Sequence, residues 1–185
     1  MVESTKRRMV DAAKQSFRQR GVTATGFSEI LQRSGAARGA IYHHFPGGKA
    51  ELVRGVIDST AGDVGELIDA LLDQAPSPAA AVADMFDLCI LAADERAGDF
   101  GCPITPAVLE ADGDTDTLAA AASAFADWQA RLSERWSADG SPAETATAWS
   151  TLVVSALEGA LVLARAERSG DPLRRAKHAL VAMLP

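Results

Sequence analysis

The segment SGAARGAIYHHFPGGKAEL, residues 34–52, decides the fold class of this 185-residue chain. It contains four glycines, two adjacent histidines and the only tyrosine of the sequence. One short apolar pattern, GFSEILQRSG at 26–35, is followed after a glycine-containing turn by a second, RGAIYHHF at 38–45. Two short helices joined in this way are typical of a helix-turn-helix, whose second helix enters the major groove of DNA.

Small side chains and hydrogen-bond donors in this segment suit contact with a DNA groove. Gly39 and Ala40 place little bulk between the backbone and DNA. Lys49 begins the next predicted helix, where its charge and the exposed N–H groups can face a phosphate. The neighbouring donors to phosphates or base edges are Arg38, Tyr42, His43 and His44.

Other interpretations of the same residues are weaker. Adjacent helical residues point about 100° apart, so His43 and His44 do not converge on one metal ion. A catalytic histidine needs a nucleophile within reach, and the sequence has no recognisable triad. Tyr42 as a core aromatic is an alternative, but Ile41 and Phe45 already supply the inward face, which favours a surface contact with phosphate. We therefore expect no metal, no cofactor and no enzymatic activity.

The net charge of −7 is divided unevenly along the chain. The first 54 residues hold ten Lys or Arg against four Asp or Glu, whereas the rest of the chain holds eight against 21. A basic head on an acidic body can meet phosphates with one face while the other faces stay in solvent. From charge alone, basic residues that simply cover solvated helix surfaces explain the pattern equally well.

Nearly every segment has the pattern of a helix, and patterns typical of strands are almost absent. We therefore expect an all-α fold of eight or nine helices. Glycine or proline separates the helices at intervals. Helices are expected at 4–20, 26–35, 38–45, 49–74, 104–111 and 115–138. Three more should begin after a cap residue followed by proline, at 77–78, 141–142 and 171–172, and SPAE at 141–144 also fits a capping box.

The two cysteines, Cys89 and Cys102, form neither a CxxC motif nor a cluster with histidine. We interpret both as buried thiols and expect neither a zinc site nor a disulfide framework. No apolar run approaches the roughly 18 residues that a membrane span needs, and the basic start of the chain leads into a polar-striped helix. The sequence therefore predicts a soluble, cytoplasmic protein without a membrane partner.

The segment FSEILQRSGAARGAIYHHFPGGKAEL, residues 27–52, resembles the DNA-binding motif of the TetR family of bacterial transcription regulators. The first 55 or so residues follow the pattern of that family. HHFPGGKAEL at 43–52, together with GCPITPAVLE at 101–110, is similar to the branch that contains the LmrA and YxaF regulators.

The resemblance implies a homodimer whose chains each have two parts. A helix-turn-helix DNA-binding domain would span residues 1–50, and a helical ligand-binding and dimerisation domain would span residues 51–185. The two heads would read a palindromic operator in double-stranded DNA, and a small-molecule effector in the body would release it. By their places in the motif, Thr25, Tyr42, His44 and Lys49 would contact phosphates, and Arg38, Gly39 and His43 would meet bases.

We expect the last two helices to form the dimer face, because the segment WSTLVVSALEGALVLARA, residues 149–166, is too apolar for a solvent-exposed terminal helix. Small residues at helical spacing there allow two helices to cross closely in a four-helix bundle between two copies. An internal helix with ordinary core packing explains the composition equally well, and the family resemblance favours the dimer. The residues expected at the dimer interface are Ala156, Gly159, Ala160 and Leu163.

Apolar and aromatic side chains of the body supply candidates for the effector cavity, although most of them serve equally well as plain core. The candidates are Phe86, Ile90, Cys102, Ile104, Phe125, Trp128, Trp149 and Val153. Few charges lie among them, which favours a planar, mostly apolar ligand.

Together these features predict a ligand-responsive transcriptional repressor. Two alternatives remain: a thiol-based redox sensor on the same fold that uses Cys102, and a helical small-molecule-binding protein that does not bind DNA. No basic residue adjoins Cys102 in the sequence, which argues against a reactive thiolate.

Overall fold

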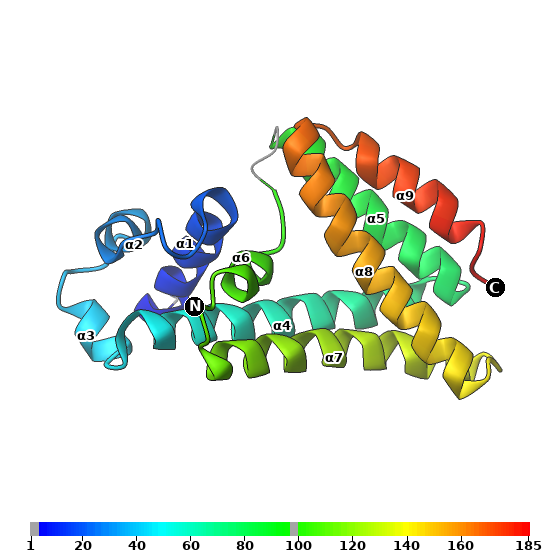
Figure 1. Cartoon of the computed structure of the whole chain (residues 1–185), viewed down its shortest axis with the longest axis horizontal. Coiled ribbons are helices and arrows are strands. Elements are labelled where there is room, and N and C mark those ends of the chain that lie inside the picture. Colours follow the sequence, from blue (N-terminus) through cyan, green and yellow to red (C-terminus); the bar gives the residue numbers. More distant parts are fainter. Residues whose placement is uncertain (1–3, 97–99) are drawn as a thin grey trace. The chain divides into compact units, whose positions relative to one another are not determined.

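The computed structural model describes residues 4–96 and 100–185, and in these ranges it contains nine α-helices and no strand (Figure 1). The helices are α1 (Thr5–Arg20), α2 (Phe27–Ser34), α3 (Ala40–His44), α4 (Gly48–Gln74), α5 (Pro78–Glu95), α6 (Ile104–Leu109), α7 (Thr115–Ala138), α8 (Ala143–Glu167) and α9 (Asp171–Val181). The predicted all-α class is confirmed.

Residues that favour helix ends set several of these bounds. The hydroxyl of Ser4 accepts a hydrogen bond from the N–H of Arg7 at 3.2 Å, which caps α1. Ser77 caps α5 in the same way, because its hydroxyl accepts from the N–H of Ala80 at 3.2 Å. α1 ends at Arg20, and Gly21 caps it with a φ of +82°, in the left-handed region that glycine adopts without strain.

Two predicted caps are wrong. α8 begins at Ala143 with Pro142 in the cap position, and no side chain caps its first turn. The extended backbone of Pro142, with ψ of 141°, places Ser141 one residue too far from the helix, which also removes the predicted capping box. α9 begins at Asp171, the residue expected to cap it, and Ser169 Oγ accepts the N–H of Asp171 at 3.1 Å.

The described residues form two compact units, each built from two separate stretches of the chain. The first unit comprises Met1–Thr60 and Cys102–Ala124, and the second comprises Ala61–Gly101 and Phe125–Pro185. α4 and α7 each contribute residues to both units. The expected division at residue 50 concerns the roles of the two parts and stays a prediction, because compactness alone does not assign a role.

The core of the first unit lies on the faces that helical periodicity predicts. Met9, Ala13 and Phe17, four residues apart on α1, are fully buried. Ile41 and Phe45 are 3% and 1% exposed, and they anchor α3 by its inner side. α1 contacts both α2 and α6, so α6 packs with the N-terminal helices.

In the second unit, α5, α8 and α9 pack against one another, and Figure 1 shows them side by side. Trp128 on α7 is buried, and its indole N–H donates to the carbonyl of Ala61 on α4 at 3.1 Å. On α4, Leu67 is exposed although it is apolar. The buried face lies one residue further along, at Ile68 and Leu72.

α8 exposes an apolar face. Leu152, Val162 and Leu163 are 38%, 55% and 55% exposed. By length and composition α8 is also apolar enough to cross a membrane, so the prediction that no run reaches that length is wrong for this helix. One such helix is weak evidence of a span, because core helices of soluble proteins pass the same test.

Candidate nucleic-acid interface

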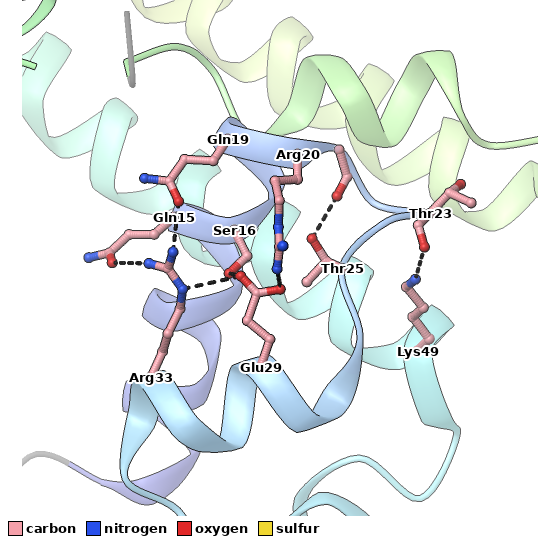
Figure 2. A network of polar contacts seen from close by, with 10 residues as sticks. Gln15, Ser16, Gln19, Arg20, Thr23, Thr25, Glu29, Arg33 and Lys49 are labelled. Carbon is pink, nitrogen blue, oxygen red and sulfur yellow. Dashed lines mark hydrogen bonds and ion pairs between the residues drawn. The ribbon is translucent and has the colours of Figure 1, made fainter. Parts of the chain in front are cut away.

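A polar network fixes α2 against α1 (Figure 2). Glu29 of α2 accepts hydrogen bonds from Ser16 Oγ at 2.8 Å and from Arg33 Nε at 3.2 Å. Glu29 also pairs with Arg20 of α1, and Arg33 reaches Gln19 Oε1 at 2.8 Å. These two arginines therefore hold the first two helices together, a role that the sequence pattern did not reveal.

The short helix α3 and the turn before it present polar side chains to solvent. Tyr42 is 81% exposed, and Arg38, Gly39 and His43 are exposed as well, whereas His44 is half-buried. A Cβ added at Gly39 would meet no atom within 4 Å, so the space in front of this turn is open. The structure thus places Tyr42 at the surface and not in the core, while its contact with phosphate stays a prediction.

The two histidines of α3 contact each other edge-on, with ring centroids 4.8 Å apart. Within residues 4–96 and 100–185, no group of three or more His, Cys, Asp or Glu side chains is placed to hold a metal ion.

Lys49 and Arg38, the two cations expected to contact DNA, differ in their hydrogen-bond partners within the chain. Lys49 Nζ donates to the carbonyl oxygen of Thr23 at 3.2 Å, so the ammonium lies beside the turn between α1 and α2 (Figure 2). Arg38 forms no hydrogen bond or ion pair with another residue of the described ranges. The Arg38 guanidinium is therefore available to an external acceptor.

Thr25 does not have the exposure that a phosphate contact needs. It is 1% exposed, and its hydroxyl donates to the carbonyl of Gly21 at 2.7 Å (Figure 2). Its backbone N–H donates to the carbonyl of Val22 at 3.1 Å. Since both donors are satisfied inside the turn, Thr25 stabilises the turn ahead of α2, and we drop it from the candidate interface.

Glu110, which directly follows α6, is a candidate that the sequence reasoning missed. Its carboxylate accepts hydrogen bonds from the N–H of Val22 at 3.2 Å and of Thr23 at 2.6 Å. Partial burial raises the pKa of Glu110, but the hydrogen bonds from this turn and the charge of Lys49 outweigh it and hold that pKa below its usual value. The only signal in the sequence is the motif GCPITPAVLE, which ends on this residue.

The eight residues predicted to bind an effector are divided between the two units. Cys102 and Ile104 belong to the first unit and the other six belong to the second, so the structure does not test whether all eight share one site. Phe86, Ile104 and Val153 are fully buried. Phe125 and Trp128 contact each other edge to face, with ring centroids 5.3 Å apart.

A groove of about 530 Å³ lies between α5 and α9 in the second unit. Of the predicted effector-binding residues only Ile90 lines it. Lys177 of α9 crosses the groove to Asp87 of α5 at 2.5 Å, and Arg174 pairs with Asp94. These ion pairs satisfy the charged groups within the chain.

The predicted dimer residues occupy two faces of α8. Gly159 and Leu163 are exposed and Ala156 is half-buried. Ala160 is 3% exposed, because it faces the packing of its own unit, so its assignment to a dimer interface is wrong. The exposed face continues instead through Leu152.

The thiols have different surroundings. Burial, reinforced by the negative charge of Glu158, raises the pKa of Cys89 to about 12, so this thiol stays protonated at neutral pH. Cys102 is half-buried in the first unit.

Two family matches cover most of the chain. Residues 9–56 match the family described as bacterial regulatory proteins, tetR family. Residues 78–179 match the family described as transcriptional regulator LmrA/YxaF-like, C-terminal domain.

Individual relatives agree with both matches. The HTH-type transcriptional regulator Rv0196 of Mycobacterium tuberculosis (strain ATCC 25618 / H37Rv) is 36% identical over 197 residues, covering 100% of this chain and 98% of that protein. LmrA, an HTH-type transcriptional regulator of Bacillus subtilis (strain 168), is 26% identical over 172 residues, covering 91% and 90% of the two chains. The crystal structure of a TetR transcriptional regulator from Legionella pneumophila has the same fold, with a TM-score of 0.87 at 19% identity over 100% of this chain and 99% of that one.

Proposed function

Because the chain belongs to the TetR family of bacterial transcriptional regulators, we propose that it is a ligand-responsive repressor. As a homodimer it binds a palindromic operator in double-stranded DNA, and a small, planar, mostly apolar molecule releases it. The observation that carries this proposal is the outer face of α3 and the turn before it: Tyr42 and His43 on α3 are exposed, Tyr42 to 81%, and Arg38 in the turn is exposed as well. Donors on a helix anchored by its apolar side suit the major groove.

In this proposal some residues of the interface fix the position of the protein on DNA, and others recognise the base sequence. Tyr42, His44 and Lys49 contact phosphates, which fix the orientation of the head on the duplex. Arg38, Gly39 and His43 face the base edges, where hydrogen bonds distinguish one sequence from another. The regulator acts on chromosomal DNA, so it works in the cytoplasm.

The exposed face of α8 supports the dimer. Leu152, Gly159 and Leu163 are seven and four residues apart, which places them on one side of the helix, and all three are exposed. An apolar face of this kind is covered when a second copy packs the same face against it. Two heads held in this way read half-sites about one DNA turn, roughly 34 Å, apart.

The aromatic residues of the second unit support a flat apolar effector. Phe125 is half-buried beside the ring of Trp128, and Trp149 on α8 is half-buried as well. Aromatic surfaces that are only partly covered by the protein offer stacking contacts to a planar molecule.

Binding to a fluorescent duplex that covers the DNA upstream of the protein's own gene tests this function. A scrambled duplex of the same length and base composition is the control. We expect the native duplex to bind tighter by roughly a thousandfold or more, because specific sites exceed non-specific DNA by at least that factor. Equal affinity for the two duplexes would contradict the proposal.

The same assay separates the alternatives. Loss of binding on addition of hydrogen peroxide, reversed by a thiol reductant and absent in Cys102→Ser, would replace the ligand-responsive repressor with a thiol sensor. A folded protein that binds neither duplex would indicate a small-molecule-binding protein without DNA binding.

A further inference from the structure

In the turn between α1 and α2, the backbone of Thr23 forms hydrogen bonds with two side chains, one through its N–H and one through its carbonyl oxygen. The N–H of Thr23 donates to Glu110 Oε2 at 2.6 Å, and the carbonyl oxygen of Thr23 accepts from Lys49 Nζ at 3.2 Å. All three residues belong to the first unit. Thr23 therefore connects a carboxylate that follows α6 with an ammonium at the start of α4.

The backbone of this turn is shaped to receive the carboxylate. The successive N–H groups of Val22 and Thr23 both donate to Glu110, and paired N–H groups of this kind form a seat for an anion. Gly21 provides the space for this carboxylate, because a Cβ added there would overlap the Glu110 side chain. The φ of +82° at Gly21 also requires glycine.

We propose that Glu110 is a positioning residue for DNA binding, which fixes the turn ahead of α2 and thereby holds Lys49 where it reaches a phosphate. The inference rests on the proposed function, since it assigns Glu110 no contact of its own with DNA. Glu110 acts through Thr23, which accepts the Lys49 ammonium on its other side.

Simple electrostatics predicts the opposite effect. Glu110 is a negative charge beside a cation of the basic head, and its removal would by charge alone strengthen the attraction for DNA. Positioning predicts weaker binding, because the turn and Lys49 then lose their fixed place. The sign of the change in affinity separates the two explanations.

The experiment measures the affinity of the full-length protein for the duplex upstream of its own gene. Glu110→Gln keeps the size of the side chain and removes the charge, and Glu110→Asp keeps the charge and shortens the reach by one methylene. We expect each to bind about tenfold more weakly than wild type, because both weaken a charge-assisted pair of hydrogen bonds. Glu134→Gln is the matched control: Glu134 is exposed on α7 without a partner in the described ranges, and its neutralisation should leave affinity within about twofold.

A double-mutant cycle with Lys49→Ala shows whether Glu110 acts through Lys49. In the Lys49→Ala background, each Glu110 variant should change affinity by less than about twofold, because the lysine that Glu110 positions is already absent. Wild-type affinity in either Glu110 variant, or the same tenfold loss with and without Lys49, overturns the positioning role. Melting curves by circular dichroism identify a variant that is unfolded under the assay conditions. If one Glu110 variant is unfolded, the affinity of the other variant tests the positioning role.

The outcome also distinguishes this inference from the function on which it rests. A wild-type protein that does not bind the duplex refutes the proposed function. A wild-type protein that binds, with a weakened Lys49→Ala and an unchanged Glu110→Gln, refutes only the positioning role.

Discussion

At the level of single residues, the candidate interface combines a cation that is hydrogen-bonded within the chain with one that is not. Lys49 is hydrogen-bonded to the carbonyl of Thr23, whereas Arg38 has no partner in the described ranges. An ammonium fixed close to the backbone suits a contact that is the same for every DNA sequence. A long guanidinium in open space suits a base edge, where its fork can pair with guanine.

Replacing Lys49 by alanine should weaken binding to the native and the scrambled duplex by similar factors. The plot of log affinity against log salt should become shallower by about one unit for each lysine removed, because one fewer phosphate is neutralised. Lys177→Ala is the control, since it removes the same charge from the second unit. An unchanged salt slope in Lys49→Ala would eliminate the phosphate contact.

Replacing Arg38 by alanine should instead reduce the preference for the native duplex. Removal of a bidentate hydrogen-bond pair to a base costs about 1 to 3 kcal/mol of discrimination at that position. The test is a set of duplexes in which each half-site position is changed in turn. If Arg38→Ala binds all of them more weakly by one common factor, Arg38 contacts phosphate and not a base.

The helical period of the sequence predicts which residues face inward, but it does not predict contacts between distant segments. Tyr42, Ile41 and Phe45 could be placed correctly because the helical period assigns inner and outer faces over a few residues. Glu110 could not be found, because its partners are backbone N–H groups 87 and 88 residues away, and no local period encodes such a contact. Thr25 was misassigned because its hydroxyl turns back onto Gly21.

At the level of helices, the sequence predicted the order of the elements and most of their bounds. α1, α4 and α7 agree with the expected ranges to within one residue at either end, because glycine or a capping residue stops the pattern sharply. The starts of α8 and α9 were harder, since a Ser-Pro or Asp-Pro pair allows the cap at more than one position.

Two serine substitutions test this difference between helix starts. Ser77→Ala should lower the free energy of unfolding by about 1 kcal/mol, because the Ser77 hydroxyl accepts the N–H of Ala80 ahead of α5. Ser141→Ala should change stability by less than about 0.5 kcal/mol, because Ser141 caps no helix. Urea unfolding followed by circular dichroism measures both. Equal losses would restore Ser141 as a cap.

For the whole molecule, the exposed apolar face of α8 is the feature that favours a second copy. Leu152, Val162 and Leu163 are exposed on a helix whose opposite side is buried. The sequence could identify the apolar helix but not its outer side, and Ala160 was placed on the wrong one. Periodicity alone does not separate a helix buried by its own chain from one buried by a partner.

Gly159→Trp should reduce dimer affinity and operator binding together. A Cβ at Gly159 meets no atom of the chain within 4 Å, so the tryptophan is accommodated in a single copy, whereas two closely packed helices are forced apart at a typical cost of about 1 to 3 kcal/mol. Gly62→Trp on α4 is the control, because a Cβ there also meets nothing within 4 Å. Sedimentation at micromolar concentration gives the result, and a monomeric wild type would refute the dimer.

The make-up of the first unit bears on how such regulators can be recombined. Cys102–Ala124 completes the unit that begins with the N-terminal helices, and Glu110 lies in that stretch. A chimera that transplants only the first 60 residues onto another body carries the turn at Thr23 without the carboxylate that occupies it. If Glu110 positions this turn as proposed, exchange of DNA specificity works best with a graft in two pieces, or with a recipient that supplies its own acid against the turn.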